Sequence, residues 1–332
     1  MINPNRQQLS RLSEIIYDRL DPLIDNDYVL LDIPDHKNIG DQAIWAGEMA
    51  YLARLPYKLK YAAPYYNVDL KKIEKDDIIL FHGGGNFGDV WDVCQKLREN
   101  VIMQCPNNKI IVFPQTVYYQ SQQALEKSAE IFNAHGNVTI CARDQVSYGL
   151  LNKYFTKCQI LLLPDMAFCL NFDSFITEEK TGKTLFVKRT DKELNTAADY
   201  HEVAELENVT TSDWPTFEPE FKQLIKYNPN FTNFFFREFL FRVANRLPIF
   251  MPLYVQPLEK IENRHDFYME LGINFLNRFD QIYTTRLHCF ILGILLGKTV
   301  YIYDNSYGKN ASFYQTWLQD FNQCHLLNES TK

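Results

Sequence analysis

Short continuous apolar runs alternate along the chain with longer stretches in which apolar residues have helical spacing. This alternation is typical of parallel strands that are covered by helices on both faces of a sheet. In the first half of the chain it predicts strands at residues 28–33, 59–63, 78–81, 110–113, 138–142 and 160–163. Helices are expected at the amphipathic N-terminus and at residues 41–54, 90–104, 121–135 and 144–153.

The alternation stops between residues 164 and 183, which end in the polar sequence EEKTGK, and then resumes. The second run predicts strands at 184–188, 281–284 and 299–303, and helices within 217–277, at 286–296 and from about 310. We therefore predict an α/β protein of two facing, doubly wound, Rossmann-like domains with a cleft between them. The expected parts are an N-terminal domain (1–170), a C-terminal domain (171–315) with an aromatic-rich helical segment (217–265), and a helix or tail (316–332) packing back on the N-terminal domain.

Composition and charge exclude several classes of protein. The chain has 332 residues and a net charge of -7, so we expect no nucleic acid partner. Its seven cysteines are scattered without a CxxC pair, which favours free thiols in a reducing compartment. The apolar run at 287–297 is too short to cross a bilayer, and the N-terminus lacks the apolar core of a signal peptide. The expected location is the cytoplasm.

In the N-terminal domain, three loops at the carboxyl ends of predicted strands carry candidate chemistry, because ligands of such sheets bind there. In the loop at 35–42, Asp41 either caps the following helix or acts on a substrate. The loop at 82–89, HGGGNFGD, leaves backbone N–H groups accessible to an anion or a sugar. It matches GxGxxG, but no acid follows the next strand, so we reject a dinucleotide site. In the loop at 141–147, Asp144 is interpreted as a helix cap, and Arg143 either forms a structural salt bridge or pairs with a carboxylate or phosphate of a ligand; the structural interpretation is favoured.

The C-terminal domain carries cations at the same edge of its predicted sheet. Arg286 and His288 combine a bidentate anion clamp with a titratable group at a helix N-terminus. Arg189 and Lys309 follow two other predicted strands. Three cationic loops at one edge of an acidic protein predict a small, strongly anionic ligand. The histidine spacing offers no zinc set, and we expect no metal.

Taken in order, these loops resemble the polysaccharide pyruvyl transferase family. The matching stretches are NIGDQAIWAG (38–47), HGGGNFGD (82–89), FPQTVYY (113–119), ARDQVSYGLL (142–151), LLPDMAF (162–168), VKRTDKE (187–193) and TRLHCFILGILLGKTVYIYDNSYGKN (285–310). The resemblance implies a fold similar to GT-B glycosyltransferases. It also implies that pyruvate is transferred from phosphoenolpyruvate to a sugar of an exopolysaccharide, capsular or cell-wall glycan precursor, forming a cyclic ketal. Phosphoenolpyruvate is then a co-substrate, no cofactor is needed, and the acceptor is expected to be lipid-linked.

The resemblance also suggests roles for individual residues. It places Arg286, Leu287 and His288 on the family's donor-binding motif and Arg189 on its second donor arginine. Phosphoenolpyruvate carries a carboxylate and a phosphate, so Lys309 is expected to bind the phosphate as a point charge. His288 is the candidate acid and Asp41 the candidate base. The residues expected to face the acceptor are Asn38, Gly40, Asp41, His82, Gly83, Gly84, Gly85 and Asn86.

Two other functions remain open at this point. A GT-B sugar-nucleotide glycosyltransferase would use the cationic edge to bind a diphosphate, although no clear ribose-binding acid is visible in the second domain. A non-catalytic subunit of a polysaccharide assembly complex would bind neither donor.

The surplus of aromatic residues in the second domain gives a further prediction. Within residues 231–247 a helix would carry one apolar face and, on the opposite arc, Arg237, Arg242 and Arg246. The apolar face consists of Phe236, Phe239, Leu240, Val243 and Leu247. It either packs on the core of its own domain or enters the headgroup region of a membrane. We predict peripheral association with the inner face of the cytoplasmic membrane through residues 231–254.

Overall fold

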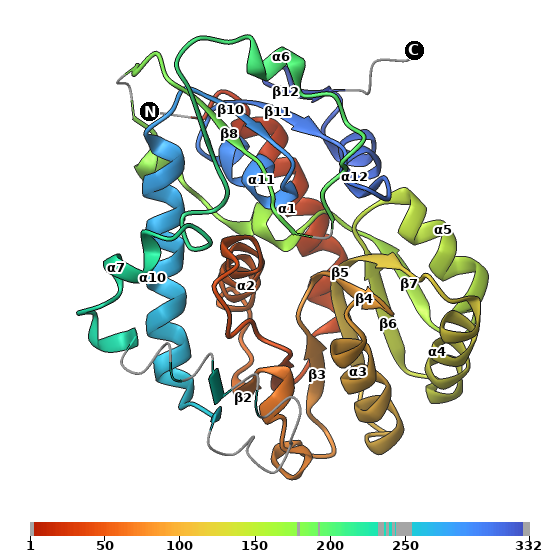
Figure 1. Cartoon of the computed structure of the whole chain (residues 1–332). Coiled ribbons are helices and arrows are strands. Elements are labelled where there is room, and N and C mark those ends of the chain that lie inside the picture. Colours follow the sequence, from red (N-terminus) through yellow and green to blue (C-terminus); the bar gives the residue numbers. More distant parts are fainter. Residues whose placement is uncertain are drawn as a thin grey trace.

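The computed structural model describes residues 3–177, 180–191, 193–231, 236, 239–240, 243 and 254–327. They form two parallel β-sheets that are flanked by helices (Figure 1). The N-terminal sheet has the strand order β2-β1-β3-β5-β6-β7, with β4 also paired to β5. The C-terminal sheet has the order β12-β11-β10-β8-β9. These two sheets confirm the predicted α/β class of two Rossmann-like domains.

The strands of the N-terminal sheet are β1 (Tyr28–Leu31), β2 (Leu59–Ala63), β3 (Ile78–Phe81), β4 (Gly84–Gly88), β5 (Ile110–Tyr118), β6 (Val138–Ala142) and β7 (Gln159–Leu162). Those of the C-terminal sheet are β8 (Thr184–Val187), β9 (Val209–Ser212), β10 (Gln281–Thr284), β11 (Thr299–Tyr303) and β12 (Cys324–Leu327). Each predicted strand is present. The central strands β1, β3, β6 and β8 are buried along their whole length, because helices cover both faces of each sheet.

The helices are α1 (Arg6–Leu20), α2 (Ile39–Leu52), α3 (Asp92–Gln104), α4 (Gln122–His135), α5 (Gln145–Tyr154), α6 (His201–Ala204), α7 (Phe221–Leu224), α10 (Leu258–Asn277), α11 (Leu287–Leu295) and α12 (Lys309–Trp317). The idea that Asp41 caps α2 is wrong, because the helix begins earlier. The Asn38 side chain accepts a hydrogen bond from the Gly40 N–H and is the cap. Asp144 caps α5 as expected, accepting from the Ser147 N–H. In the part of the chain that is described, no helix combines the length and apolarity needed to cross a membrane.

The two sheets are joined by a shared hydrophobic core. Ile39 and Ala43 of α2 belong to the same buried cluster as Leu292 of α11 and strands β8, β10 and β11. Helix α1 also reaches both sheets, since Leu12 belongs to the shared cluster while Ile16 lies in the N-terminal core. Just before the helix, the Asn3 Nδ2 donates to the Ile294 carbonyl oxygen at 2.8 Å. In Figure 1 the long helix α10 likewise runs beside both halves of the molecule. The domains therefore form one packed unit.

The end of the described chain contributes to both domains. Strand β12 pairs with β11 and completes the edge of the C-terminal sheet. The preceding helix α12 contacts the N-terminal domain, where the Trp317 Nε1 donates to the Arg143 carbonyl oxygen at 2.8 Å. The segment expected as a tail that packs back on the N-terminal domain thus also supplies a strand of the C-terminal sheet.

Gly47 lies where α2 meets the short 3₁₀ helix Met166–Cys169. A Cβ atom at Gly47 would lie 2.0 Å from the Met166 carbonyl oxygen, and this backbone contact cannot be relieved by rotating a side chain. We expect Gly47→Ala to lower the free energy of unfolding by about 3 kcal/mol, measured by urea denaturation. Gly149→Ala is the matched control, because a Cβ atom at that position of α5 meets nothing within 4 Å. That control should be neutral or slightly stabilising, and equal effects of the two variants would contradict the prediction.

Candidate functional site

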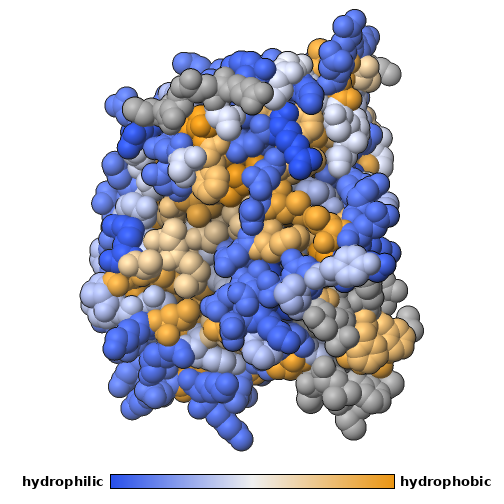
Figure 2. All heavy atoms as spheres, turned by 90° about the vertical axis from the view of Figure 1, so that its left-hand side faces the viewer, coloured by the Kyte–Doolittle hydropathy of each residue, from blue (hydrophilic) through white to orange (hydrophobic). Residues whose placement is uncertain are grey.

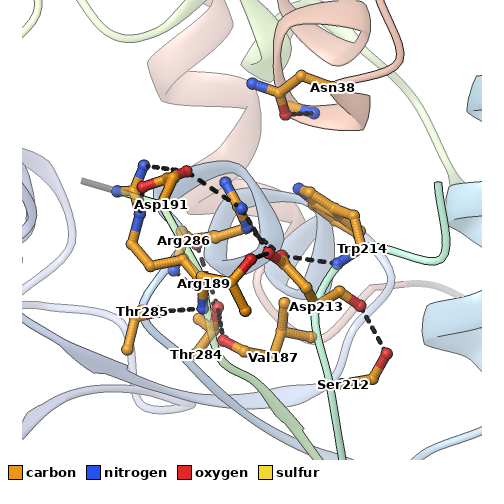
Figure 3. A network of polar contacts seen from close by, with 12 residues as sticks. Asn38, Val187, Arg189, Asp191, Ser212, Asp213, Trp214, Thr284, Thr285 and Arg286 are labelled. Carbon is orange, nitrogen blue, oxygen red and sulfur yellow. Dashed lines mark hydrogen bonds and ion pairs between the residues drawn. The ribbon is translucent and has the colours of Figure 1, made fainter. Parts of the chain in front are cut away.

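Arg286 and Arg189 lie side by side because they follow the neighbouring parallel strands β10 and β8 (Figure 3). The Arg286 Nη2 lies 2.7 Å from the Asp213 Oδ2, and its Nε contacts the other oxygen of the same carboxylate. Asp213 follows β9 and is buried. The Arg286 Nη2 also lies 3.3 Å from the Asp191 Oδ2. Arg286 is therefore held by a bidentate, buried partner and also contacts a second carboxylate.

Arg189 connects this pair to Lys309. Its Nε lies 2.7 Å from the Asp191 Oδ1, and its Nη1 lies 2.8 Å from the Glu193 Oε2. The same Glu193 oxygen accepts from the Lys309 Nζ at 2.7 Å. Burial opposes ionisation of Glu193, but Lys309 and Arg189 outweigh it and hold the pKa of this carboxyl well below its usual range. The structure thus brings the three predicted cations together, and each is paired with a carboxylate.

His288 forms a second cluster with Asp165 and Arg143. Its Nε2 lies 3.2 Å from the Asp165 Oδ2 and 3.4 Å from the Arg143 Nη1. The Arg143 Nη1 lies 2.6 Å from the same Asp165 oxygen, and both of these side chains are buried. Although burial disfavours the charged form, His288 and Arg143 lower the pKa of Asp165, which stays ionised. The interpretation of Arg143 as only a structural salt bridge is incomplete, because its ion pair holds the candidate catalytic histidine.

Glycines bring the loops of the N-terminal domain close to both clusters. A Cβ atom at Gly85 would lie 3.3 Å from the Arg143 Nη2 and 3.8 Å from the Lys309 Nζ. A Cβ atom at Gly40 would lie 2.9 Å from the His288 Nδ1. The bare backbone at Gly40 and Gly85 therefore leaves room for His288 and Lys309 of the C-terminal domain and for Arg143 of the N-terminal domain. The two clusters and the glycine-rich loop form one site.

The residues expected to face the acceptor fall into two groups. Asp41 accepts from the Asn38 Nδ2 at 2.7 Å and is partly exposed at the start of α2. A Cβ atom at Gly84 would lie 3.9 Å from the Asp41 Oδ1, so this carboxylate lies beside the glycine-rich loop. His82, in contrast, is buried, and its Nδ1 lies 2.9 Å from the Glu48 Oε2. The structure places Asp41 near the shared site and His82 beneath it.

The second group supports the glycine-rich loop from inside. The Gly83 N–H donates to the Glu48 Oε1 at 2.7 Å. The Asn86 Nδ2 donates to the Asp32 Oδ2 at 3.0 Å, and the Asn86 side chain also contacts the fully buried Arg98. Leu287, expected at the donor site, packs its side chain into the shared core. These internal contacts fix the loop and the start of α11 in place.

Sequence reasoning did not find four acidic residues of the site: Asp165, Asp191, Glu193 and Asp213. Asp165 follows β7 and lies at the same edge of its sheet as the other loops, which is a signal that could have been used. Asp191 and Glu193 lie within the family-like stretch VKRTDKE, whereas Asp213 has no such motif. Within the described ranges, no three His, Cys, Asp or Glu side chains gather in a way that could hold a metal ion.

The chain is similar to known proteins over most of its length. A family model described as polysaccharide pyruvyl transferase matches residues 38–307. The chain is 32% identical to the putative pyruvyl transferase EpsO of Bacillus subtilis (strain 168), covering 98% of this chain and 94% of that protein. It is also 32% identical to pyruvyl transferase 1 of Schizosaccharomyces pombe, covering 87% of this chain and 69% of that protein.

A solved structure of a functionally uncharacterized protein from Klebsiella pneumoniae has a similar fold. It aligns with a TM-score of 0.61 at 18% identity and covers 96% of this chain and 98% of that one. The family match and the identity to EpsO both extend over most of the chain, including the loops that carry Asp41, Gly85, Arg189 and Arg286. This protein therefore belongs to the polysaccharide pyruvyl transferase family.

Proposed function

We propose that this protein transfers pyruvate from phosphoenolpyruvate to a sugar of an exopolysaccharide, capsular or cell-wall glycan precursor and forms a pyruvate ketal. The observation that carries the proposal is the single site in which Arg189, Arg286 and Lys309 lie near His288 and the glycine-rich loop. Membership of the family supports it as well.

The cations fit the charge of this donor. Phosphoenolpyruvate carries a carboxylate and a phosphate close together, and guanidinium groups bind both kinds of anion through two parallel hydrogen bonds. Arg286 and Arg189 would hold the anionic groups, and Lys309 would hold the phosphate as a point charge. Arg143 adds a cation from the N-terminal domain, since it lies beside both His288 and Gly85.

The reaction requires one proton donor and a base for the sugar hydroxyls. His288 gives a proton to the methylene carbon, which leaves C2 electron-poor, and one sugar hydroxyl adds to C2 and loses its proton. A second hydroxyl then adds to C2, loses its proton and displaces phosphate, closing the ketal ring. Asp165 would orient the imidazole, as carboxylates do for catalytic histidines, and Asp41 would accept a hydroxyl proton.

Differential scanning fluorimetry tests the donor assignment against the two alternatives. Phosphoenolpyruvate alone should raise the Tm, because a ligand that binds the folded state stabilises it. Nucleotide sugars alone should leave the Tm unchanged. Stabilisation by nucleotide sugars but not by phosphoenolpyruvate would favour a GT-B glycosyltransferase, and stabilisation by neither would favour a non-catalytic subunit.

The transfer should not need a divalent metal ion. Side-chain cations can neutralise the donor at this site, so chelating the metal removes nothing that the proposed reaction uses. We expect release of phosphate from phosphoenolpyruvate, in the presence of a glycan acceptor, to continue at an unchanged rate in EDTA. Activity that is lost in EDTA and restored by Mg²⁺ would contradict this prediction.

We further propose that the protein binds the surface of an anionic membrane, where a lipid-linked acceptor would be held. The side chains of Phe236 and Phe239 are 58% and 60% exposed, and Leu224 and Tyr227 on the neighbouring segment are also exposed. Figure 2 shows the side of the molecule that carries α7 and α10, where hydrophobic residues form a band between hydrophilic regions. Arg237, Arg242, Arg246 and Leu247 lie outside the described residues. On the predicted apolar face, Phe236 and Phe239 are exposed, whereas Leu240 and Val243 are half-buried. The two exposed phenylalanines would be the side chains that enter the membrane.

Liposome flotation tests this attachment. The wild-type protein should float with vesicles that contain anionic lipid, because large apolar side chains gain about 1.5–3 kcal/mol each on leaving water. Phe236→Ser/Phe239→Ser should remain in solution while keeping the wild-type Tm, since both side chains are more than half exposed. The matched control is Met103→Ser, which removes an exposed apolar side chain from α3 and should still float. A wild-type protein that does not float would refute the proposal.

A further inference from the structure

Asp191 holds the two arginines of the site in the way that a bound anion would. Its Oδ1 accepts from the Arg189 Nε at 2.7 Å, and its Oδ2 lies 3.1 Å from the Arg189 Nη2 and 3.3 Å from the Arg286 Nη2 (Figure 3). Partial burial opposes ionisation, but Arg189 and Arg286 lower the pKa of Asp191 below its usual value. One carboxylate of the chain thus lies between both guanidinium groups.

The three carboxylates of this cluster differ in their exposure. The Asp191 side chain is 44% exposed, whereas those of Asp213 and Glu193 are 2% and 9% exposed. Asp213 is bidentate to Arg286 and also accepts from the Trp214 N–H, and Glu193 bridges Arg189 and Lys309. Moving either buried carboxylate would leave its buried cationic partner without a counter-charge and without water to solvate it. Asp191 is the one of the three that can turn into solvent.

The charges of the cluster show what such a movement would do. Three cations, Arg189, Arg286 and Lys309, face three carboxylates, so the cluster is neutral when Asp191 is in place. When Asp191 turns outward, the cluster gains a net positive charge and both arginines regain free N–H donors. A carboxylate or phosphate on a ligand could then bridge the two guanidinium groups.

We propose that Asp191 is a specificity-determining carboxylate that occupies the place of the donor's anionic group and must be displaced for the donor to bind. A ligand with a single negative charge would make about the same contacts with the arginines as Asp191 does. It would therefore compete poorly, because Asp191 belongs to the same chain and has a high effective concentration. A ligand with two anionic groups can displace Asp191 and contact Lys309 as well. The identity of that ligand as phosphoenolpyruvate rests on the proposed function, whereas the competition with Asp191 does not.

The variant Asp191→Asn separates the charge of this side chain from its structural role. The Asp191 Oδ1 also accepts from the Glu193 N–H at 3.1 Å, and an asparagine retains that oxygen and therefore the turn. Calorimetric titration at fixed salt should show that Asp191→Asn binds both inorganic phosphate and phosphoenolpyruvate at least about tenfold more tightly than the wild type. The reason is that the anion no longer has to displace the charge-assisted hydrogen bonds between Asp191 and the two arginines. If Asp191 only orients the arginines, Asp191→Asn should instead bind both anions more weakly than the wild type.

Two matched variants complete the design. Asp92→Asn removes an exposed acid that pairs with Lys96 on α3, and it should leave both affinities unchanged although the net charge changes equally. Asp213→Asn removes a buried partner of Arg286 and should weaken binding of both anions. Asp191→Ser repeats the loss of charge with a smaller side chain that can still accept a hydrogen bond.

The possible outcomes distinguish this proposal from the proposed function. Tighter binding of inorganic phosphate by Asp191→Asn and Asp191→Ser supports the competition, even if phosphoenolpyruvate does not bind and the donor assignment fails. Unchanged or weaker binding of both anions by the two variants overturns the competition, even if the wild type binds phosphoenolpyruvate and the donor assignment stands.

Discussion

Replacing Arg286 with alanine is expected to weaken binding of phosphoenolpyruvate by at least about 100-fold, or ~3 kcal/mol. Arg286 would present a rigid pair of N–H donors to the donor's anionic group. Its orientation is set by the bidentate contact with Asp213, so little entropy is lost on binding. Isothermal titration calorimetry with phosphoenolpyruvate measures the loss directly.

The control for this experiment concerns stability. Arg286→Ala leaves the buried Asp213 without its cation and should lower the free energy of unfolding by about 3–5 kcal/mol. Arg286→Ala/Asp213→Ala removes both charges and should recover much of the stability without recovering donor binding. A folded variant without Arg286 that binds phosphoenolpyruvate as tightly as the wild type would contradict the donor site.

Replacing His288 with alanine should have a different signature, in which kcat falls by about 10²–10⁴-fold while affinity for phosphoenolpyruvate stays within a few-fold of the wild type. The imidazole lies outside the arginine cluster but next to it, so its loss removes a proton donor rather than an anion clamp. Asp165 keeps its ion pair with Arg143 when His288 is absent, and the fold should be retained.

Two further variants test whether His288 acts as an acid. His288→Gln keeps a hydrogen-bonding side chain of similar size but cannot deliver a proton at neutral pH, so its kcat should be as low as that of the alanine variant. Asp165→Asn should lower kcat less, because it disturbs only the orientation of the imidazole. Wild-type kcat in His288→Gln, or loss of donor affinity without loss of kcat, would exclude this role.

Most of the sheet framework could be predicted because buried parallel strands leave a strong pattern. The runs at 59–63, 78–81, 138–142, 281–284 and 299–303 match their strands residue for residue. The rule that ligands lie beyond the carboxyl ends of such strands led us to predict a site in the loops after these strands, and the structure brings Arg189 and Arg286 together there.

Three strands escaped prediction for identifiable reasons. Strand β4 has the sequence GGNFG, and glycines predict a turn unless a neighbouring strand such as β5 pairs with them. Strand β9 is an edge strand of short polar residues, VTTS, without an apolar run. Strand β12, CHLL, is too short and mixed to differ from a loop. In each case the pairing partner, rather than the local sequence, determines the strand.

The acidic half of the site escaped prediction because partners far apart in sequence leave no local pattern. Asp213 meets Arg286 and Asp165 meets His288 only after the chain has folded. The burial of His82 against Glu48 has the same origin, since a histidine at the end of a strand can point into the loop or beneath it. Local sequence indicates which edge carries chemistry, but side-chain partners depend on tertiary packing.

The core that joins the two sheets bears on how substrates enter. A wide hinge opening between the domains would expose Ile39 and Ala43, which pack among residues of the C-terminal domain. It would also break the Asn3 contacts that tie the start of α1 to the end of α11. Exposing a large apolar side chain such as Ile39 costs roughly 1.5–3 kcal/mol, so each such side chain adds to the free energy of opening the domains. Entry of substrates should instead depend on local motion of loops such as the one that carries Asp191, and the two halves should melt together in a single cooperative transition.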